Sequence, residues 1–90
     1  MLDIVYRNAF KKEYALAQRR GKDMSKLHAV VRVLALGNVL DPRHKNHKLT
    51  GNFNGHWECH IQPDWLLIYK VTSAELSLYR TGSHADLFGK

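Results

Sequence analysis

The chain has 90 residues, which gives room for one domain with one compact core. Hydrophobic residues make up 44% and charged residues 24%, a composition typical of a folded protein and not of a disordered one. Fourteen Lys and Arg against eight Asp and Glu give a net charge of +6, which favours a polyanionic partner, either nucleic acid or an acidic protein.

The sequence also argues against a membrane or secreted protein. No run approaches eighteen apolar residues, and the first residues lack the continuous apolar core of a signal peptide. A single cysteine, Cys59, excludes an internal disulfide and fits a reducing compartment. We therefore expect a cytoplasmic protein with a single domain over residues 1–90 and no membrane contact.

The first third of the chain predicts one strand and two helices. Residues 2–6 form a short β-rich run. Residues 9–20 repeat apolar side chains at helical spacing after Asn8, a reasonable N-cap, and residues 24–36 repeat them again after Asp23. Because the connection is short, we expect the two helices to form an antiparallel hairpin.

The second half predicts a small sheet. Residues 43–55 are polar and rich in Gly and Asn, which indicates a loop. Residues 56–62 alternate apolar and polar side chains, residues 65–71 are nearly all apolar as in a central strand covered on both faces, and residues 76–81 form a further strand. The fold class is therefore α+β, with an N-terminal strand and a helical hairpin packed on a small, mainly antiparallel sheet.

A short helical turn is expected at the C-terminus. Ser83 to Asp86 matches the S/T-x-x-D/E pattern of a helix start, and Gly89 follows as a stop. The turn would hold His84 at the end of the sheet and project Phe88 on the same side, since the two are four residues apart. An aromatic ring such as that of Phe88 can hold an unstacked base, or it can only pack the C-terminus against the core.

Five polar side chains can converge if the strands pair in sequence order: His47, His60, Asp64, Arg80 and His84. Such a set suits cleavage of RNA by its own 2′-hydroxyl. That reaction needs a base for the 2′-OH proton, an acid for the departing 5′-oxygen and a cation near the charge on phosphorus. Histidine serves as acid or base near neutral pH, and arginine matches phosphate. The reaction requires no metal or other cofactor.

Other readings of these residues remain open. His and Asp are also zinc ligands, but His60 and Asp64 stand across a Pro-containing turn, and no Cys pair or HExxH motif accompanies them. A nucleic-acid-binding module without catalysis is the alternative from another class. We interpret His28 and His44 as surface residues, and His56 as surface or the rim of the site.

The sequence resembles the YafQ-like branch of the RelE/ParE toxin superfamily over almost its whole length. The resemblance is carried by separated motifs in the right order: His47-Lys48-Leu49-x-Gly51, the run from Trp57 to Tyr69 (WECHIQPDWLLIY), and the run from Arg80 to Phe88 (RTGSHADLF). ParE-like gyrase poisons share the fold, but the histidine set favours the nuclease branch.

The resemblance implies an mRNA interferase, a toxin that enters the ribosomal A site and cuts the messenger there. It also implies a DinJ- or RelB-like antitoxin that masks the site, with the pair binding operator DNA and repressing its own operon. A degenerate toxin that acts only in the antitoxin complex is a further possibility.

The resemblance also assigns roles to individual residues. The motif positions give four catalytic residues, His47, His60, Asp64 and His84, with His84 as general acid and the base open among the other three. They also give Arg80 as the phosphate-stabilising cation. Two residues are assigned to substrate binding: Phe88 and Lys48.

Overall fold

The computed structural model describes residues 1–89, and its elements follow the predicted order with three short additions. The elements are β1 (Asp3–Tyr6), α1 (Asn8–Arg19), α2 (Met24–Ala35), η1 (Pro42–His44), β2 (His47–Lys48), η2 (Gly51–Phe53), β3 (Trp57–Gln62), β4 (Trp65–Val71), β5 (Glu75–Gly82) and α3 (His84–Phe88), where η marks a 3₁₀ helix. None of the helices in this part of the chain is long and apolar enough to cross a lipid bilayer.

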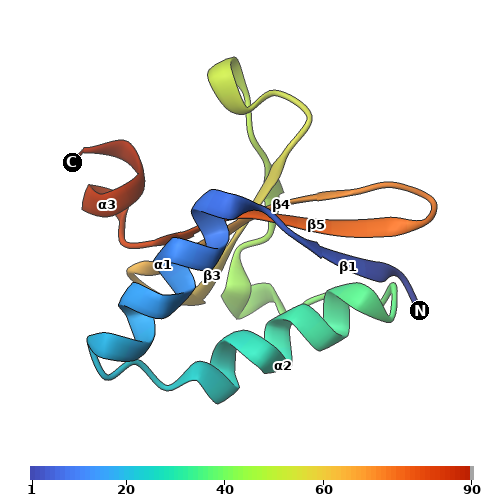
Figure 1. The fold of residues 1–90 in the computed structure, drawn as a ribbon. Helices are drawn as coiled ribbons and strands as arrows, with labels where there is room; N and C mark the ends of the chain where they lie inside the picture. Colours follow the sequence, from blue (N-terminus) through green and yellow to red (C-terminus); the bar gives the residue numbers. More distant parts are fainter. Residues whose placement is uncertain (90) are drawn as a thin grey trace.

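The strands form one five-stranded sheet in the order β1-β5-β4-β3-β2. Strands β2 to β5 pair antiparallel in sequence order, and β1 adds to β5 in parallel at one edge. Figure 1 shows β1 and β5 side by side. The predicted α+β class with a mainly antiparallel sheet is confirmed.

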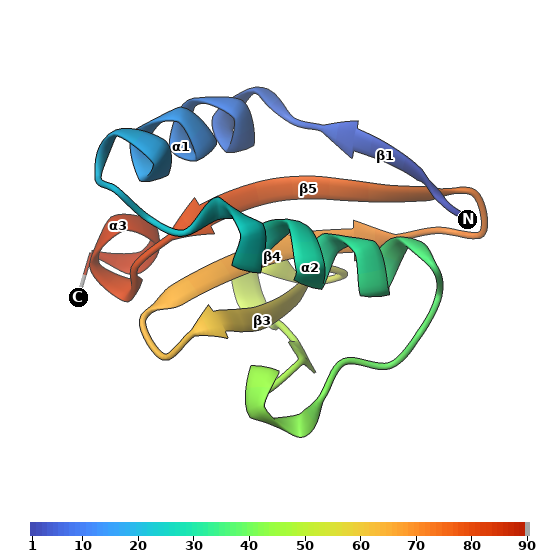
Figure 2. The ribbon, with the colours of Figure 1, turned by 90° about the horizontal axis from the view of Figure 1, so that it is seen from below.

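Helix α2 lies across one face of this sheet and α1 lies beside β5 (Figure 2), and both helices contribute to the core on that face. Their apolar stripes meet the side chains of β3 to β5, and Phe10 and Leu27 are almost fully buried there against Trp65 and Leu67. Helix α1 contacts mainly β5, whereas α2 contacts β3 and β5. The two helices are joined by a short turn, as predicted, and diverge from it as a V in Figure 1.

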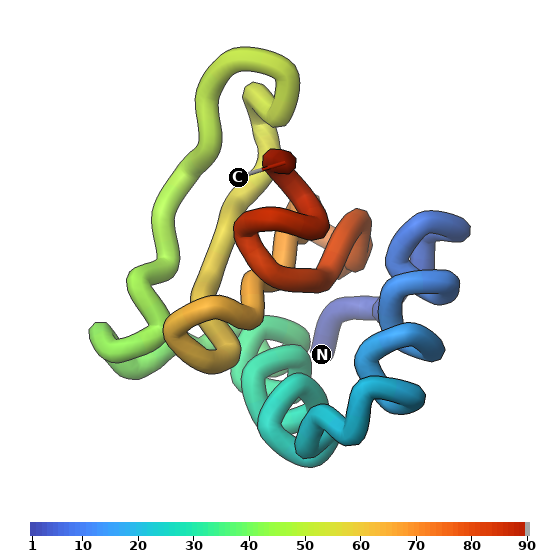
Figure 3. Tube along the Cα trace, turned by 90° about the vertical axis from the view of Figure 1, so that its left-hand side faces the viewer, coloured from blue at the N-terminus to red at the C-terminus, as the bar shows by residue number. Residues whose placement is uncertain are grey.

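The opposite face of the sheet is covered by α3 and the loop that contains η2. Leu66 and Ile68 of β4 are completely buried there under Leu87 of α3, with Leu49 and Phe53 of the loop packed beside them. Strand β4 is therefore buried on both faces, as its nearly unbroken apolar sequence predicts. Figure 3 shows α3 between this loop and α1.

Three local features differ from the sequence prediction. Residues 43–55, expected to be a loop, contain η1, β2 and η2. Arg7, not Asn8, occupies the N-cap of α1, and no side chain caps this helix. Strand β5 carries a bulge, because Ile68 pairs with Arg80 while Tyr69 pairs with Leu78, which leaves Tyr79 as the extra residue.

Candidate active site

Asp64 and His84 are joined by two hydrogen bonds on the α3 face of the sheet. Asp64 lies in the β3–β4 turn, and His84 is the first residue of α3. The Nδ1–H of His84 donates to Asp64 Oδ1 at 2.7 Å, and the backbone N–H of His84 donates to the same oxygen at 3.0 Å. These two bonds hold the pKa of Asp64 below its usual value, the backbone bond contributing most. Nε2 is the imidazole nitrogen left for a substrate.

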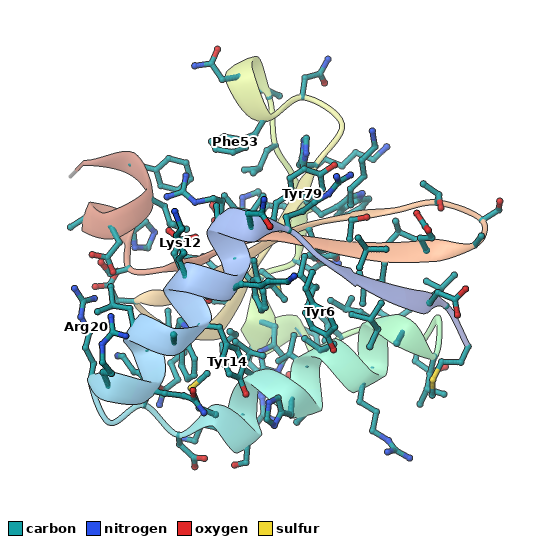
Figure 4. All side chains as sticks on the ribbon, viewed as in Figure 1. Tyr6, Lys12, Tyr14, Arg20, Phe53 and Tyr79 are labelled. Atoms are coloured by element: carbon teal, nitrogen blue, oxygen red, sulfur yellow. The ribbon has the colours of Figure 1, made fainter. Side chains whose placement is uncertain are left out.

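The start of α3 is fixed independently of Asp64. The Ser83 hydroxyl accepts from the backbone N–H of Asp86, and the Asp86 carboxylate accepts from the backbone N–H of Ser83, which completes the predicted capping box. Asp86 also forms an ion pair with Arg20 at 2.9 Å, and Figure 4 shows Arg20 at the end of α1. His84 is thus carried on a helical turn that is held at both the sheet and α1.

A buried carboxylate, Glu58, lies between two of the predicted histidines. Its Oε1 is 3.5 Å from His47 Nε2 and 3.6 Å from His60 Nε2, and only 5% of the residue is exposed. His47 pairs with Glu58 across β2 and β3, and His60 follows Glu58 by two residues on the same face of β3. Glu58 therefore bridges the two histidines of β2 and β3 from a buried position.

The Nδ1 atom of His47 forms a hydrogen bond to the backbone. Its Nδ1 donates to the carbonyl oxygen of Lys45 at 2.7 Å, so Nε2 carries the lone pair when the ring is neutral. The His47 side chain is 50% exposed and that of His60 only 16%. His44, interpreted from the sequence as a surface residue, is instead partly buried, with its Nδ1 2.6 Å from the His60 carbonyl oxygen.

The two halves of the site meet through the rings of His60 and His84, whose centroids are 5.7 Å apart. The side chains therefore form one continuous series across β2, β3, the β3–β4 turn and α3: His47, Glu58, His60, His84 and Asp64. Four of the five side chains predicted to converge belong to this series. We call it the histidine–carboxylate series.

Arg80 and Lys48 do not join the series. Both Nε and Nη2 of Arg80 donate to the carboxylate of Glu13 on α1 at 2.8 Å, although the sequence predicted convergence with the histidines. The Lys48 ammonium lies 5.5 Å from the ring centroid of Trp57. Neighbouring residues of a strand point to opposite faces, so Lys48 faces away from the side that carries His47.

Phe88 lies in an aromatic group at the edge of the site. Its ring is 38% exposed and meets Phe53 edge to face at 6.0 Å. His56 contacts both Phe53 and Tyr79, with ring centroids 6.1 Å and 4.3 Å away. Figure 4 places Phe53 and Tyr79 close together above the sheet, beside the η2 loop. Of the two readings for His56, the position at the rim of the site fits this geometry.

A groove of about 610 Å³ opens beside Asp64, between the end of α1, the β3–β4 turn and the start of α3. Its charged lining consists of two cations, Arg20 and Lys22, and three carboxylates, Glu13, Asp64 and Asp86. Lys22 places its ammonium 5.7 Å from the ring centroid of Trp65 in the floor. The groove therefore carries charges of both signs beside the Asp64–His84 pair.

Sequence reasoning missed Glu58 and Phe53. The alternation of β3 predicts that Glu58 lies on the same face as His60. The burial of Glu58, however, depends on its pairing with β2, which the sequence does not predict. The position of Phe53 depends on η2, for which the sequence has no periodic pattern. Among residues 1–89, no group of three or more His, Cys, Asp or Glu side chains is arranged to hold a metal ion.

Comparison with known proteins identifies relatives that match nearly the whole chain. Residues 2–89 match the family model described as the bacterial toxin of type II toxin–antitoxin systems, YafQ. The mRNA interferase toxin YafQ of Escherichia coli K12 is 43% identical over 88 residues, which cover 97% of this chain and 96% of that protein.

Two solved structures are similar along nearly their whole length. The E. coli DinJ–YafQ complex contains a chain that matches with a TM-score of 0.92 and 42% identity, covering 99% of this chain and all of that one. A metal-bound toxin from Helicobacter pylori matches with a TM-score of 0.92 and 38% identity, covering 98% of this chain and all of that one. The predicted family and the endoribonuclease class are confirmed. The chain belongs to the YafQ family of bacterial toxins of type II toxin–antitoxin systems, whose curated relatives are mRNA interferases.

Proposed function

We propose that this protein is a toxin that cleaves mRNA in the ribosomal A site by attack of the RNA's own 2′-hydroxyl, without a metal. The observation that carries the proposal is the histidine–carboxylate series. It places a partly exposed imidazole at one end and a carboxylate-held imidazole at the other, and an acid–base cleavage of RNA needs these two groups. The net charge of +6 supports an RNA substrate.

His47 is the general base in this mechanism. Its Nδ1–H is held by the Lys45 carbonyl, so the neutral ring presents the Nε2 lone pair to the 2′-hydroxyl. When Nε2 takes the proton, the imidazolium lies 3.5 Å from the Glu58 carboxylate, which stabilises it. His60 is more buried and shares Glu58 from the other side, so its role is to hold that carboxylate in place.

His84 is the general acid. In the imidazolium form, Nδ1–H binds Asp64 and Nε2–H is free to protonate the departing 5′-oxygen. Asp64 stabilises the positive ring and fixes its orientation, as the carboxylate of a catalytic triad does for its histidine. Because its pKa is lowered, Asp64 is a weak base. We therefore assign it the role of orienting His84 and not that of deprotonating the 2′-hydroxyl.

Arg80 stabilises the charge that develops on phosphorus, and Phe88 holds a base of the substrate. Arg80 pairs in register with Ile68, and Ile68 with Glu58, so Arg80 starts from the face of the sheet that carries the series. Phe88 is exposed and supported edge-on by Phe53, which leaves one ring face for stacking. Lys48 contributes positive charge at the sheet edge.

The partners follow from the family and the charge. The E. coli relative is found in a complex with DinJ, and we propose a DinJ-like antitoxin for this chain, with operator DNA bound only through that complex. The ribosome and its message are the targets of the free toxin, which acts in the cytoplasm. The chain forms a single functional domain over residues 1–90.

The proposal is tested with purified ribosomes that carry a defined message. The parent protein should cut the message in the A site and leave the same RNA intact without ribosomes. A His84→Ala variant should cut roughly 100-fold or more slowly, because an acid is lost. Equal cleavage of free RNA would remove the ribosome requirement, and full activity of His84→Ala would remove the acid assignment.

Two controls separate this function from its alternatives. A chelator should not slow cleavage, whereas a metal-dependent nuclease would lose its activity, and the metal-bound relative makes this comparison necessary. Expression of the chain alone in bacteria should arrest translation. A non-catalytic binding module or a degenerate toxin would leave growth unaffected.

A further inference from the structure

Glu13 of α1 holds Arg80 in a two-pronged ion pair. Glu13 Oε1 accepts from Arg80 Nε at 2.8 Å, and Oε2 accepts from Arg80 Nη2 at 2.8 Å. This parallel arrangement fixes the plane of the guanidinium as well as its position. The two residues are 67 apart in the sequence, so only the packing of α1 on β5 brings them together.

The Glu13 carboxylate is itself held in place. Its Oε1 accepts a third hydrogen bond, from the backbone N–H of Thr81 at 3.2 Å, so the carboxylate is tied to the strand that carries Arg80. Glu13 is the only acidic residue of α1, and its side chain is 18% exposed. The pair is therefore shielded from solvent more than an ordinary surface ion pair, which makes its geometry more persistent.

The contact leaves half of the guanidinium available. Glu13 occupies the edge formed by Nε and Nη2, whereas the edge formed by Nη1 and Nη2 still carries hydrogen-bond donors. The Arg80 side chain is 30% exposed, so a phosphate has access to that second edge without displacing Glu13.

The sheet register places Arg80 in the same row as two residues of the histidine–carboxylate series. His47, Glu58, Ile68 and Arg80 are consecutive partners in one row across β2, β3, β4 and β5. Neighbouring strands are about 4.8 Å apart, so the Cα atoms of Glu58 and Arg80 are separated by roughly 10 Å. Arg80 is therefore two strands from Glu58, and Glu13 fixes the orientation of its guanidinium.

We propose that Glu13 is a positioning residue for the cleavage reaction: it fixes the Arg80 guanidinium so that its free edge meets the scissile phosphate. The inference rests on the proposed function and assigns a role to a residue of the N-terminal helix. The opposite role, a carboxylate that blocks Arg80 until the substrate displaces it, is less consistent with the open second edge.

The experiment uses single-turnover cleavage on ribosomes at saturating protein, with Glu13→Gln as the main variant. The amide keeps the size of the side chain and one acceptor for Thr81, but its NH₂ group opposes the Arg80 donors. We expect the cleavage rate to fall roughly tenfold, because a misplaced catalytic group is costly. The protein concentration at half-maximal rate should change less than threefold.

Two matched variants control for charge and for folding. Glu75→Gln removes the same charge from an exposed position at the other end of β5 and should cut like the parent. Glu13→Asp keeps the carboxylate and should lose less activity than Glu13→Gln. Thermal unfolding of each variant shows whether a loss of rate follows from a loss of fold.

A double variant distinguishes positioning from a structural role. Arg80→Gln should slow cleavage roughly 100-fold. If Glu13 acts through Arg80, adding Glu13→Gln to this variant should cause no further loss. The inference would be overturned if the double variant lost the product of the two single losses, or if Glu13→Gln cut as fast as or faster than the parent. Either result would leave the proposed function intact. A parent protein that does not cut would instead overturn the proposed function on which the inference rests.

Discussion

Asp64 Oδ1 accepts two hydrogen bonds from His84, one from the imidazole Nδ1–H and one from the backbone N–H. The bonds join the β3–β4 turn to the start of α3, so the same contact fixes the fold at that point and orients the imidazole. It also fixes which nitrogen faces the substrate. In the proposed mechanism the Asp64 charge stabilises the His84 imidazolium, whose Nε2–H is the proton donated to the leaving group.

Asp64→Asn should slow cleavage and change its pH dependence. The amide oxygen still accepts the bonds from His84, so the ring stays in place, but the negative charge that favours the imidazolium is lost. We expect a rate loss of roughly tenfold at neutral pH, with the decline at high pH moved to lower pH. Single-turnover rates across the pH range measure both effects. An unchanged profile would show that His84 is not the acid.

The same substitution should change stability only above acidic pH. His84 lowers the pKa of Asp64 in the folded protein, so the ionised carboxylate stabilises the fold above the ordinary value of 3.8, and this contribution is lost as pH falls through the lowered pKa. The parent should therefore resist urea better than Asp64→Asn at neutral pH, and the difference should vanish at strongly acidic pH. A difference that grows on acidification would contradict the sign of the shift.

Glu58→Gln should separate stability from activity. Glu58 is buried between two imidazoles, so removal of its charge relieves a desolvation cost while the amide fills the same space. We expect an unchanged or higher melting temperature together with a cleavage rate at least tenfold lower, because the His47 imidazolium loses its counter-ion. Calorimetry measures the melting temperature, and the ribosome assay on the same sample measures the cleavage rate. A variant that is both active and stable would leave Glu58 without a role in the reaction.

Ser83→Ala should weaken the C-terminal turn that carries His84. The hydroxyl of Ser83 caps α3 by accepting the Asp86 N–H, and loss of such a cap costs about 1 kcal/mol. Urea unfolding should show that loss, and the cleavage rate should fall with it. Ser73→Ala, in the exposed β4–β5 turn, is the control and should leave both quantities unchanged.

The sequence predicted the fold well because the sheet and helices follow strong periodic patterns. The unbroken apolar run of β4 predicts a strand covered on both faces, and the alternation of β3 predicts which of its side chains enter the helix-side core. The C-terminal turn was predicted from its capping residues alone, and the structure shows both bonds of the Ser83–Asp86 box.

The candidate site was predicted less completely, because parts of it depend on long-range contacts. Strand β2 has only two residues and no periodic signal, so the sequence did not show that His47 and Lys48 point to opposite faces. The burial of Glu58 follows from its pairing with that strand. The Glu13–Arg80 pair depends on how α1 packs on β5, which no local pattern encodes.

In the proposed mechanism the message supplies its own nucleophile, so a message with one 2′-deoxynucleotide at the cleaved position lacks the attacking group. Ribosomes carrying the ordinary message should yield an upstream product with a 2′,3′-cyclic phosphate and a downstream product with a 5′-hydroxyl, whereas the deoxy message should stay intact. Cleavage of the deoxy message, or a 5′-phosphate on the downstream product, would contradict the account.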